Sequence, residues 1–500
     1  MKLIVSSLPE KEGLVVNYNP EYHGIFFHQY AQQDKRWQRF CLMALDWFRK
    51  FPVTPIYEGR SFNDIFTFHG IPAWDFFHEI LWEEGLGVFN AFYNAISYMD
   101  IIEEYGVDEV EIRGIMEYPV GDIFRNRRIR TSDKSIKPIQ NKPSNLKRML
   151  SLKASSIFNR YRRGVPLVIT SHNLANKELH PSDARYLHGL VQKNYQFVSL
   201  EKNATQSNLS WYGFVPVSSI LESRGKLREY KLLFSKISQT SEYKRLTNLY
   251  GGILKHVIDY IPAYLCMLDL TYKTVENMIS RTMPSEIFTI DGMGIRGKMV
   301  NYICNRLGIP VYFPQLGIVS PLPVHNVAFD ANCDRRLLPI FLAWDNHTKN
   351  IIASKGWPLD KIIIQGYWKK KIKRNQDIDI SKNILYATCA NTDKMTWIAS
   401  VPEEVHLIKE LRKEIPKEYT IFVKIHPSLD YSDYDINGVR LIKDGTIEDI
   451  MSKCSMLITK TSASYLDASY NGIPAYSINL TSNVNVSGFP ITNIKDLTGL

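Results

Sequence analysis

The sequence has few cysteines, and they are scattered. Its six cysteines among 500 residues form no CxxC pair, and no histidine and cysteine residues share the spacing of a zinc site. Scattered thiols are typical of a reducing compartment, where disulfides do not persist. We therefore expect no disulfide framework and no metal site built on thiols.

Long hydrophobic runs are also missing. The uncharged stretch at residues 85–99 has 15 residues and includes two asparagines, so it is too short and too polar to cross a bilayer. The amino-terminal run becomes polar at Ser6, sooner than in a secretory signal peptide. We therefore expect a cytoplasmic protein, and attachment at the inner face of the cell membrane stays open.

Acidic residues are nearly absent from residues 125–163. This basic segment has thirteen lysines and arginines and one acid, Asp133, so its charge of +12 exceeds the net charge of +10 of the whole chain. Its first half is polar and contains prolines, which favours a loop. Its second half, residues 144–163, predicts a basic amphipathic helix.

Three interpretations of that helix are open. It could lie on an anionic membrane surface, form a solvated basic face of the domain, or bind nucleic acid. Aromatic residues are sparse in the segment and it contains no RNA-binding motif, so we expect no nucleic acid partner. The membrane surface is our preferred interpretation.

The chain is rich in aromatic residues between residues 23 and 100. Their spacing predicts helices with a buried aromatic core, and an aromatic wall that binds a saccharide acceptor is the alternative. The residues are Phe26, Phe27, Trp37, Phe40, Trp47, Phe62, Phe66, Trp74, Phe76, Phe77 and Trp82. Further along, we expect residues 196–270 to be mostly helical, with Pro262 interrupting a helix.

The clearest pattern lies in the last third of the chain. Three short apolar runs, residues 420–425, 456–459 and 475–478, do not alternate with polar residues, which indicates buried parallel strands. Thr446 followed by Asp449 predicts a capping box, and Gly472 predicts the end of a helix. A further strand is expected at residues 383–387, before the small polar loop that contains Thr388 and Cys389.

Polar residues follow two of these strands. His426 and Pro427 come after the first, and Thr461, Ser462 and Ser464 come after the second. Ligands of open parallel sheets bind beyond the carboxyl ends of the strands, and the start of a helix suits an anion. We therefore predict a nucleotide or phosphate site there. Alternatively, His426 is a turn residue and the serines are helix N-caps.

A second α/β unit begins at Glu286. A strand over residues 287–290 precedes Asp291 and Gly292, and a helix over residues 298–307 and a strand over residues 310–313 follow. The glycine spacing is that of a dinucleotide fingerprint, but Phe313-Pro314-Gln315 stands where its acidic strand end belongs. Asp291 is therefore either a catalytic carboxylate or a simple N-cap.

The string His426-Pro427, then Thr461-Ser462, Ser464, Asp467-Ala468 and Gly472-Ile473-Pro474 resembles the donor half of GT-B glycosyltransferases. It is most similar to bacterial sialyltransferases and Kdo transferases of capsule and surface polysaccharide synthesis, which use CMP-activated sugars. The resemblance covers about the last 160 residues, and the first 280 only loosely. Asp467 stands where most such sequences have glutamate, and a single carboxylate precedes Gly292 where that family has two.

This resemblance implies roles for individual residues. Asp291 would be the catalytic base, and His426 would donate a hydrogen bond or a proton to the donor phosphate. Gly292, His426, Pro427, Thr461, Ser462, Ser464 and Asp467 would form the nucleotide-binding set, with Asp467 on ribose or cytosine. Neither a metal nor another cofactor is implied, and the partners would be a nucleotide-sugar donor and a saccharide or glycolipid acceptor.

We accordingly predict an α/β protein of the GT-B class with two Rossmann-like domains facing a central cleft. The acceptor-side domain would span residues 1–368, with helical insertions and the basic segment, and the donor domain residues 383–500, after a linker over residues 369–382. Two alternatives stay open: a GT-B enzyme with a UDP-sugar or CDP-glycerol donor, and a non-catalytic saccharide-binding module. UDP-sugar 2-epimerases share the architecture but lack a long basic insertion.

Overall fold

The computed structural model describes most of the chain. The described residues are 1–83, 87–115, 120–125, 129–136, 162–170, 195–199, 208–248, 254–290, 292–322, 333–367, 372, 380–389, 400–427, 429–480, 484–485 and 487–499. They form an α/β structure with three all-parallel main sheets. The fold class is confirmed as α/β with Rossmann-like domains, and there is one sheet more than the sequence predicts.

The extra sheet lies near the amino terminus. Its strand order is β3-β2-β1-β8-β9, and all neighbours are parallel. The strands are β1 (Lys2–Ser6), β2 (Leu14–Asn17), β3 (Ile25–Phe26), β8 (Glu109–Ile115) and β9 (Arg130–Ile136). Leu3, Val5, Val15 and Val16 are fully buried in it, as the apolar pattern at the start of the chain requires.

Strand β9 corrects the prediction of a loop in the first half of the basic segment. It pairs with β8 along seven residues. The Lys134 ammonium lies 2.8 Å from a carboxylate oxygen of Glu111, and Arg130 lies 3.7 Å from Glu109. The two glutamates of β8 thus offset the positive charge of this stretch, which had favoured the prediction of a loop. Residues 137–161, with most of the predicted basic helix, lie outside the described residues.

Helices cover this sheet and connect it to the next one. They include α1 (Phe27–Ala31), α2 (Asp34–Lys50), α3 (Phe62–Ile65), α4 (Trp74–Glu83), α5 (Val88–Tyr105) and α6 (Gly121–Arg125). All eleven aromatic residues highlighted in the sequence are buried among them. The core interpretation is therefore confirmed, because buried rings do not form a wall for an acceptor.

The second sheet has seven strands in the order β12-β11-β10-β13-β14-β15-β16. They are β10 (Leu167–Thr170), β11 (Gln196–Ser199), β12 (Asn208–Ser210), β13 (Ile287–Thr289), β14 (Val311–Pro314), β15 (Ile340–Ala343) and β16 (Ile362–Ile364). Its helices include α9 (Val217–Ile237), α10 (Ser241–Thr247), α11 (Lys255–Ile258), α12 (Ile261–Thr282), α13 (Ile295–Leu307) and α14 (Asn346–Ser354).

The described part of residues 196–270 is mostly helical, as the sequence predicts, with α9, α10, α11 and the first half of α12. The stretch begins with strands β11 and β12 rather than helices, and β11 is buried beside β10, where its short apolar run packs in the sheet interior. Pro262 marks the predicted interruption, since α11 ends at Ile258 and a new helix, α12, begins at Ile261. It stands in the first turn of α12, where no intrahelical partner exists for a backbone N–H and proline is tolerated.

The third sheet forms the carboxyl-terminal domain, with strand order β19-β18-β17-β20-β21. The strands are β17 (Asn383–Ala387), β18 (Thr420–Lys424), β19 (Arg440–Ile442), β20 (Met456–Thr459) and β21 (Ala475–Ser477), and the helices are α15 (Val401–Glu414), α16 (Ile447–Met451) and α17 (Ser464–Tyr470). The predicted strands are confirmed, and so is the capping box of Thr446 and Asp449. Gly472, with φ of 65°, takes the left-handed conformation that ends α17.

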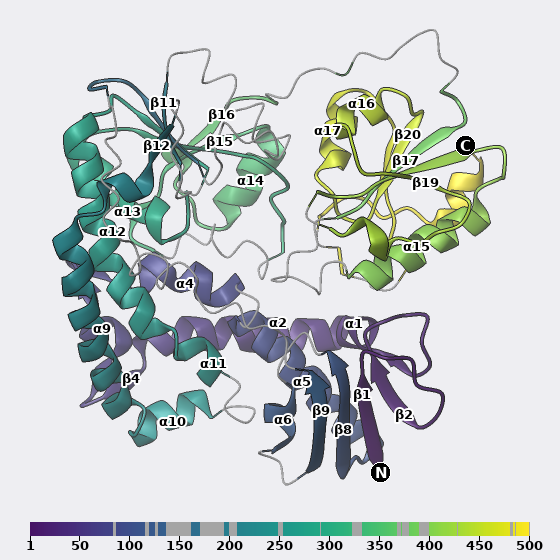
Figure 1. Ribbon diagram of the computed structural model, residues 1–500, viewed down its shortest axis with the longest axis horizontal. Coiled ribbons are helices and arrows are strands. Elements are labelled where there is room, and N and C mark those ends of the chain that lie inside the picture. Colours follow the sequence, from purple (N-terminus) through teal and green to yellow (C-terminus); the bar gives the residue numbers. More distant parts are fainter. Residues whose placement is uncertain are drawn as a thin grey trace.

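The seven-stranded and carboxyl-terminal domains lie side by side above the helical layer, and the amino-terminal sheet lies below the carboxyl-terminal domain (Figure 1). Contacts join these parts. Lys409 on α15 lies 2.9 Å from Glu21, which follows β2, and Tyr367, which follows β16, donates to Asp467 on α17. None of the helices in the described ranges is both long enough and apolar enough to cross a membrane.

Candidate functional site

The predicted polar clusters meet at the carboxyl edge of the carboxyl-terminal sheet. His426 follows β18 and Thr461 follows β20, and β17 lies between those two strands in the sheet. The chain runs from β17 outward to β18 and β19 and then crosses back to β20 on the other side. Such a reversal is a topological switch point, the place where open α/β sheets bind ligands.

The loop after β17 links the two clusters. The His426 backbone N–H donates to Thr388 Oγ1 over 2.8 Å. On the other side, the Thr461 backbone N–H lies 3.1 Å from the Cys389 Sγ, and the Thr461 hydroxyl lies 2.9 Å from the same sulfur. The ends of three neighbouring strands therefore form one connected unit, which we call the three-loop site and define as Thr388, Cys389, His426, Thr461, Ser462 and Ser464.

The two serines of this site are held by the strand end and by each other. The Ser462 backbone N–H donates to Thr459 Oγ1 over 3.1 Å, and the hydroxyls of Ser462 and Ser464 lie 3.0 Å apart. Neither serine is the N-cap of α17, since that position belongs to Ala463. Helix α17 has only seven residues, so hydroxyl groups rather than a long helix dipole are the donors available for an anion.

Asp467, on α17, contacts the neighbouring domain. Its side chain is 3% exposed, and one carboxylate oxygen accepts from the Tyr367 hydroxyl over 2.8 Å. Its predicted contact with ribose or cytosine stays a prediction. Pro427 is exposed beside the half-buried His426.

Asp291, the predicted base, lies outside the described residues. Its neighbours Ile290 and Gly292 follow β13, the central strand of the seven-stranded sheet. Gly292 is required there because a Cβ atom would come within 2.5 Å of the Phe313 ring. The Gly292 carbonyl accepts from the Asn301 side-chain amide over 3.1 Å, which ties this turn to α13.

Three charged residues outside the predicted set of site residues support the three-loop site. Glu403 and Glu404, in the first turn of α15, and Lys460, at the end of β20, are all buried. A signal was present: Glu403 and Glu404 fall on the same helix face as Leu407, Ile408 and Leu411, where a core residue is expected. Two acids at core positions indicate buried partners.

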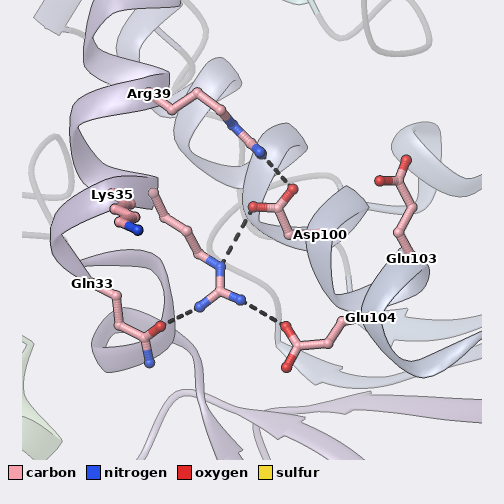
Figure 2. Close-up of a pocket in the computed structure, with 7 residues that line it drawn as sticks. Gln33, Lys35, Arg39, Asp100, Glu103 and Glu104 are labelled. Carbon is pink, nitrogen blue, oxygen red and sulfur yellow. Dashed lines mark hydrogen bonds and ion pairs between the residues drawn. The ribbon is translucent and has the colours of Figure 1, made fainter.

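A separate cavity of about 620 Å³ lies between α2 and α5, lined by Gln33, Lys35, Arg36, Arg39, Asp100, Glu103 and Glu104 (Figure 2). Arg36 donates to Gln33 and Glu104, and its Nε lies 3.5 Å from Asp100, which also accepts from Arg39. The arginines are thus already engaged by neighbouring side chains. This cavity belongs to the helical layer and includes no residue of the three-loop site.

Among the described residues, no group of three or more His, Cys, Asp or Glu side chains is placed to hold a metal ion. The predicted independence from metal stays a prediction, because Asp291 and other acids lie outside those residues. No protein-family model and no curated protein matches the chain.

Solved structures with a similar arrangement do exist. A UDP-N-acetylglucosamine 2-epimerase from Rickettsia bellii has 10% identity and a TM-score of 0.35, over 64% of this chain and 79% of that one. The Neisseria meningitidis UDP-GlcNAc 2-epimerase, bound to UDP-GlcNAc, has 13% identity and a TM-score of 0.33, over 64% and 83%. The spinosyn rhamnosyltransferase SpnG, complexed with spinosyn aglycone, has 12% identity and a TM-score of 0.32, over 63% and 80%. At these values we draw nothing about function from the likeness.

Proposed function

We propose that the protein is a glycosyltransferase that moves a sugar from a nucleotide-activated donor to a saccharide or glycolipid acceptor. The observation that carries this proposal is the three-loop site. Hydroxyl groups from β20 and a histidine from β18 are tied together through the loop after β17, at the switch point of a parallel sheet.

The chemistry of these groups suits the phosphate of a departing nucleotide. Negative charge grows on that phosphate as the glycosidic bond to it breaks, so donors that are already in place lower the barrier. Thr461, Ser462 and Ser464 would supply hydroxyl donors, and the imidazole of His426 would donate a hydrogen bond or a proton. Asp291 would accept the proton of the attacking acceptor hydroxyl as general base.

The donor is the finer part of the proposal. We propose a CMP-activated nonulosonic acid or Kdo, on the sequence resemblance of residues 426–474 to transferases that use such donors, in the synthesis of a surface polysaccharide or glycolipid. Asp467 would contact ribose or cytosine after a rearrangement of its bond to Tyr367. We further propose that the protein is cytoplasmic and that residues 144–163 attach it to an anionic membrane surface.

A nucleotide panel followed by mutagenesis tests the function. Thermal shift with CMP, CDP, UDP and dinucleotides should show stabilisation by CMP, since a ligand at 100 times its Kd adds about 2.7 kcal/mol. His426→Ala and Asp291→Ala should each reduce sugar transfer and CMP release by about a hundredfold or more, because each removes a group that acts in the transition state. Circular dichroism verifies the fold of both variants.

The outcomes separate the alternatives. A shift with UDP or CDP alone would replace the CMP donor with a UDP-sugar or CDP-glycerol donor. No shift with any nucleotide would favour a non-catalytic saccharide-binding module. Sugar transfer at the parent rate in both variants would contradict the mechanism.

A further inference from the structure

The first turn of α15 carries two adjacent carboxylates inside the carboxyl-terminal domain. Glu403 and Glu404 are each 1% exposed. Burial of a charged carboxylate is costly unless hydrogen bonds or an opposite charge compensate for it. Their partners therefore show which parts of the domain these two residues hold together.

Glu404 joins two of the three loops directly. It accepts from the Cys389 backbone N–H over 2.8 Å, just after β17, and from the Tyr434 hydroxyl over 3.0 Å, in the segment that follows β18. Cys389 in turn contacts Thr461 through its sulfur. One buried carboxyl group is thus connected to the segments that follow β17, β18 and β20.

Glu403 contacts the loop that follows β20. Its carboxylate lies 2.6 Å from the Lys460 ammonium, and this pair is buried. Lys460 directly precedes Thr461, and its carbonyl accepts from the Ser477 hydroxyl over 2.8 Å. The backbone at Thr461 is therefore fixed both through Lys460 and through Cys389.

We propose that Glu404 is a positioning residue of the three-loop site, and that its charge opposes the anion bound there. This inference rests on the proposed function. The loops stay linked in either protonation state, because a neutral carboxyl group can accept from Cys389 and donate to Tyr434 after rotation of the tyrosine hydroxyl. The charge, by contrast, is present only in the ionised state.

The surroundings of Glu404 make this charge sensitive to pH. Burial raises the pKa of Glu404 to about 7. The hydrogen bonds from Cys389 and Tyr434 and the nearby Lys460 ammonium lower this pKa, but by less than burial raises it. The groups that face it are Tyr386 and Cys389 from β17 and its loop, Tyr434, Lys460, and Glu403 on its own helix. Glu403 and Lys460 neutralise each other, so Glu404 supplies the net charge of the cluster.

Anion binding at two pH values tests the proposal. Pyrophosphate and CMP are titrated by calorimetry into the full chain, into Glu404→Gln, and into Glu410→Gln as the matched control. Glu410 is on the same helix, where it pairs with Lys413. At about pH 8 we expect Glu404→Gln to bind pyrophosphate about three- to tenfold more tightly than the parent, and at about pH 6 equally tightly, because the glutamine keeps the links but carries no charge.

A second variant separates charge from position. Glu404→Leu removes both links and should weaken pyrophosphate binding about tenfold or more at both pH values, with fold verified by circular dichroism. The same affinity ratio of Glu404→Gln to parent at both pH values would overturn the proposal, as would absence of pyrophosphate binding to the parent. Pyrophosphate binding without CMP or UDP binding would instead overturn the proposed function and leave this inference standing.

Discussion

At the scale of single residues, the carboxyl-terminal domain depends on charges that solvent does not reach. The pair of Glu403 and Lys460 is buried at 2.6 Å, next to Thr461. A buried ion pair adds little net stability over an apolar pair of the same shape, but loss of one partner leaves the other charge without compensation. The pair therefore serves mainly to fix the position of the loop that follows β20.

We predict that Lys460→Met destabilises the domain by about 3–5 kcal/mol, because Glu403 keeps a buried charge. The double variant Glu403→Gln, Lys460→Met should lose much less than the sum of the single changes. Urea unfolding followed by circular dichroism measures each variant in a double-mutant cycle. The control is Lys413→Met, which breaks an exposed pair on α15, the helix that carries Glu403. Its free energy of unfolding should equal that of the parent. Additive losses in the cycle would contradict the prediction.

At the scale of elements, charge density misled the sequence analysis and apolar periodicity did not. Strand β9 lies at the edge of its sheet and has two basic residues and one acid. It forms because Glu109 and Glu111 of the neighbouring strand β8 pair with its basic residues. That neighbour is about twenty residues away in the chain, so local composition could not reveal it. The same applies to β11, whose partner is β10.

The rest of the basic segment carries the membrane prediction. The full chain should sediment with vesicles that contain anionic lipid and should be released as salt rises, because salt screens the attraction between basic side chains and anionic lipid. Replacing Lys147, Arg148, Arg160 and Arg162 with glutamine should abolish this binding. Replacing the four lysines Lys226, Lys231, Lys236 and Lys244 of α9 and α10 provides a control of equal charge. Equal sedimentation with neutral vesicles would refute an electrostatic attachment.

At the scale of the whole molecule, α17 connects the three-loop site to the seven-stranded domain. The Tyr470 hydroxyl donates to Asp345, and the Tyr470 ring stacks on Tyr367 at 4.4 Å between ring centres. Trp344 meets both rings edge-on. The helix that begins at Ser464 therefore ends against loops that follow β15 and β16.

We predict that Tyr470→Ala shifts the two domains toward more separated arrangements, with a larger radius of gyration in X-ray scattering. Tyr470→Phe should have a smaller effect, since it keeps the stack and loses one hydrogen bond worth about 1 kcal/mol. Tyr470 is the better target, because Asp345 also caps α14 by accepting from the Thr348 N–H. Tyr431→Phe, which loses a bond within one domain, is the control. An unchanged radius in Tyr470→Ala would exclude a role in domain contact.

The sequence by itself determined the strands of the carboxyl-terminal domain, its capping box at Thr446 and the polar residues at the strand ends. These follow from neighbouring residues, because buried parallel strands are continuous apolar runs and caps are local hydrogen bonds. The tertiary structure alone decided that β17 lies between β18 and β20, so that Thr388 and Cys389 join His426 to Thr461. It also decided which partners Glu403 and Glu404 contact and that Asp467 faces Tyr367. Those outcomes depend on which distant segments pair, and strand order is set by packing across the whole domain rather than by any local pattern.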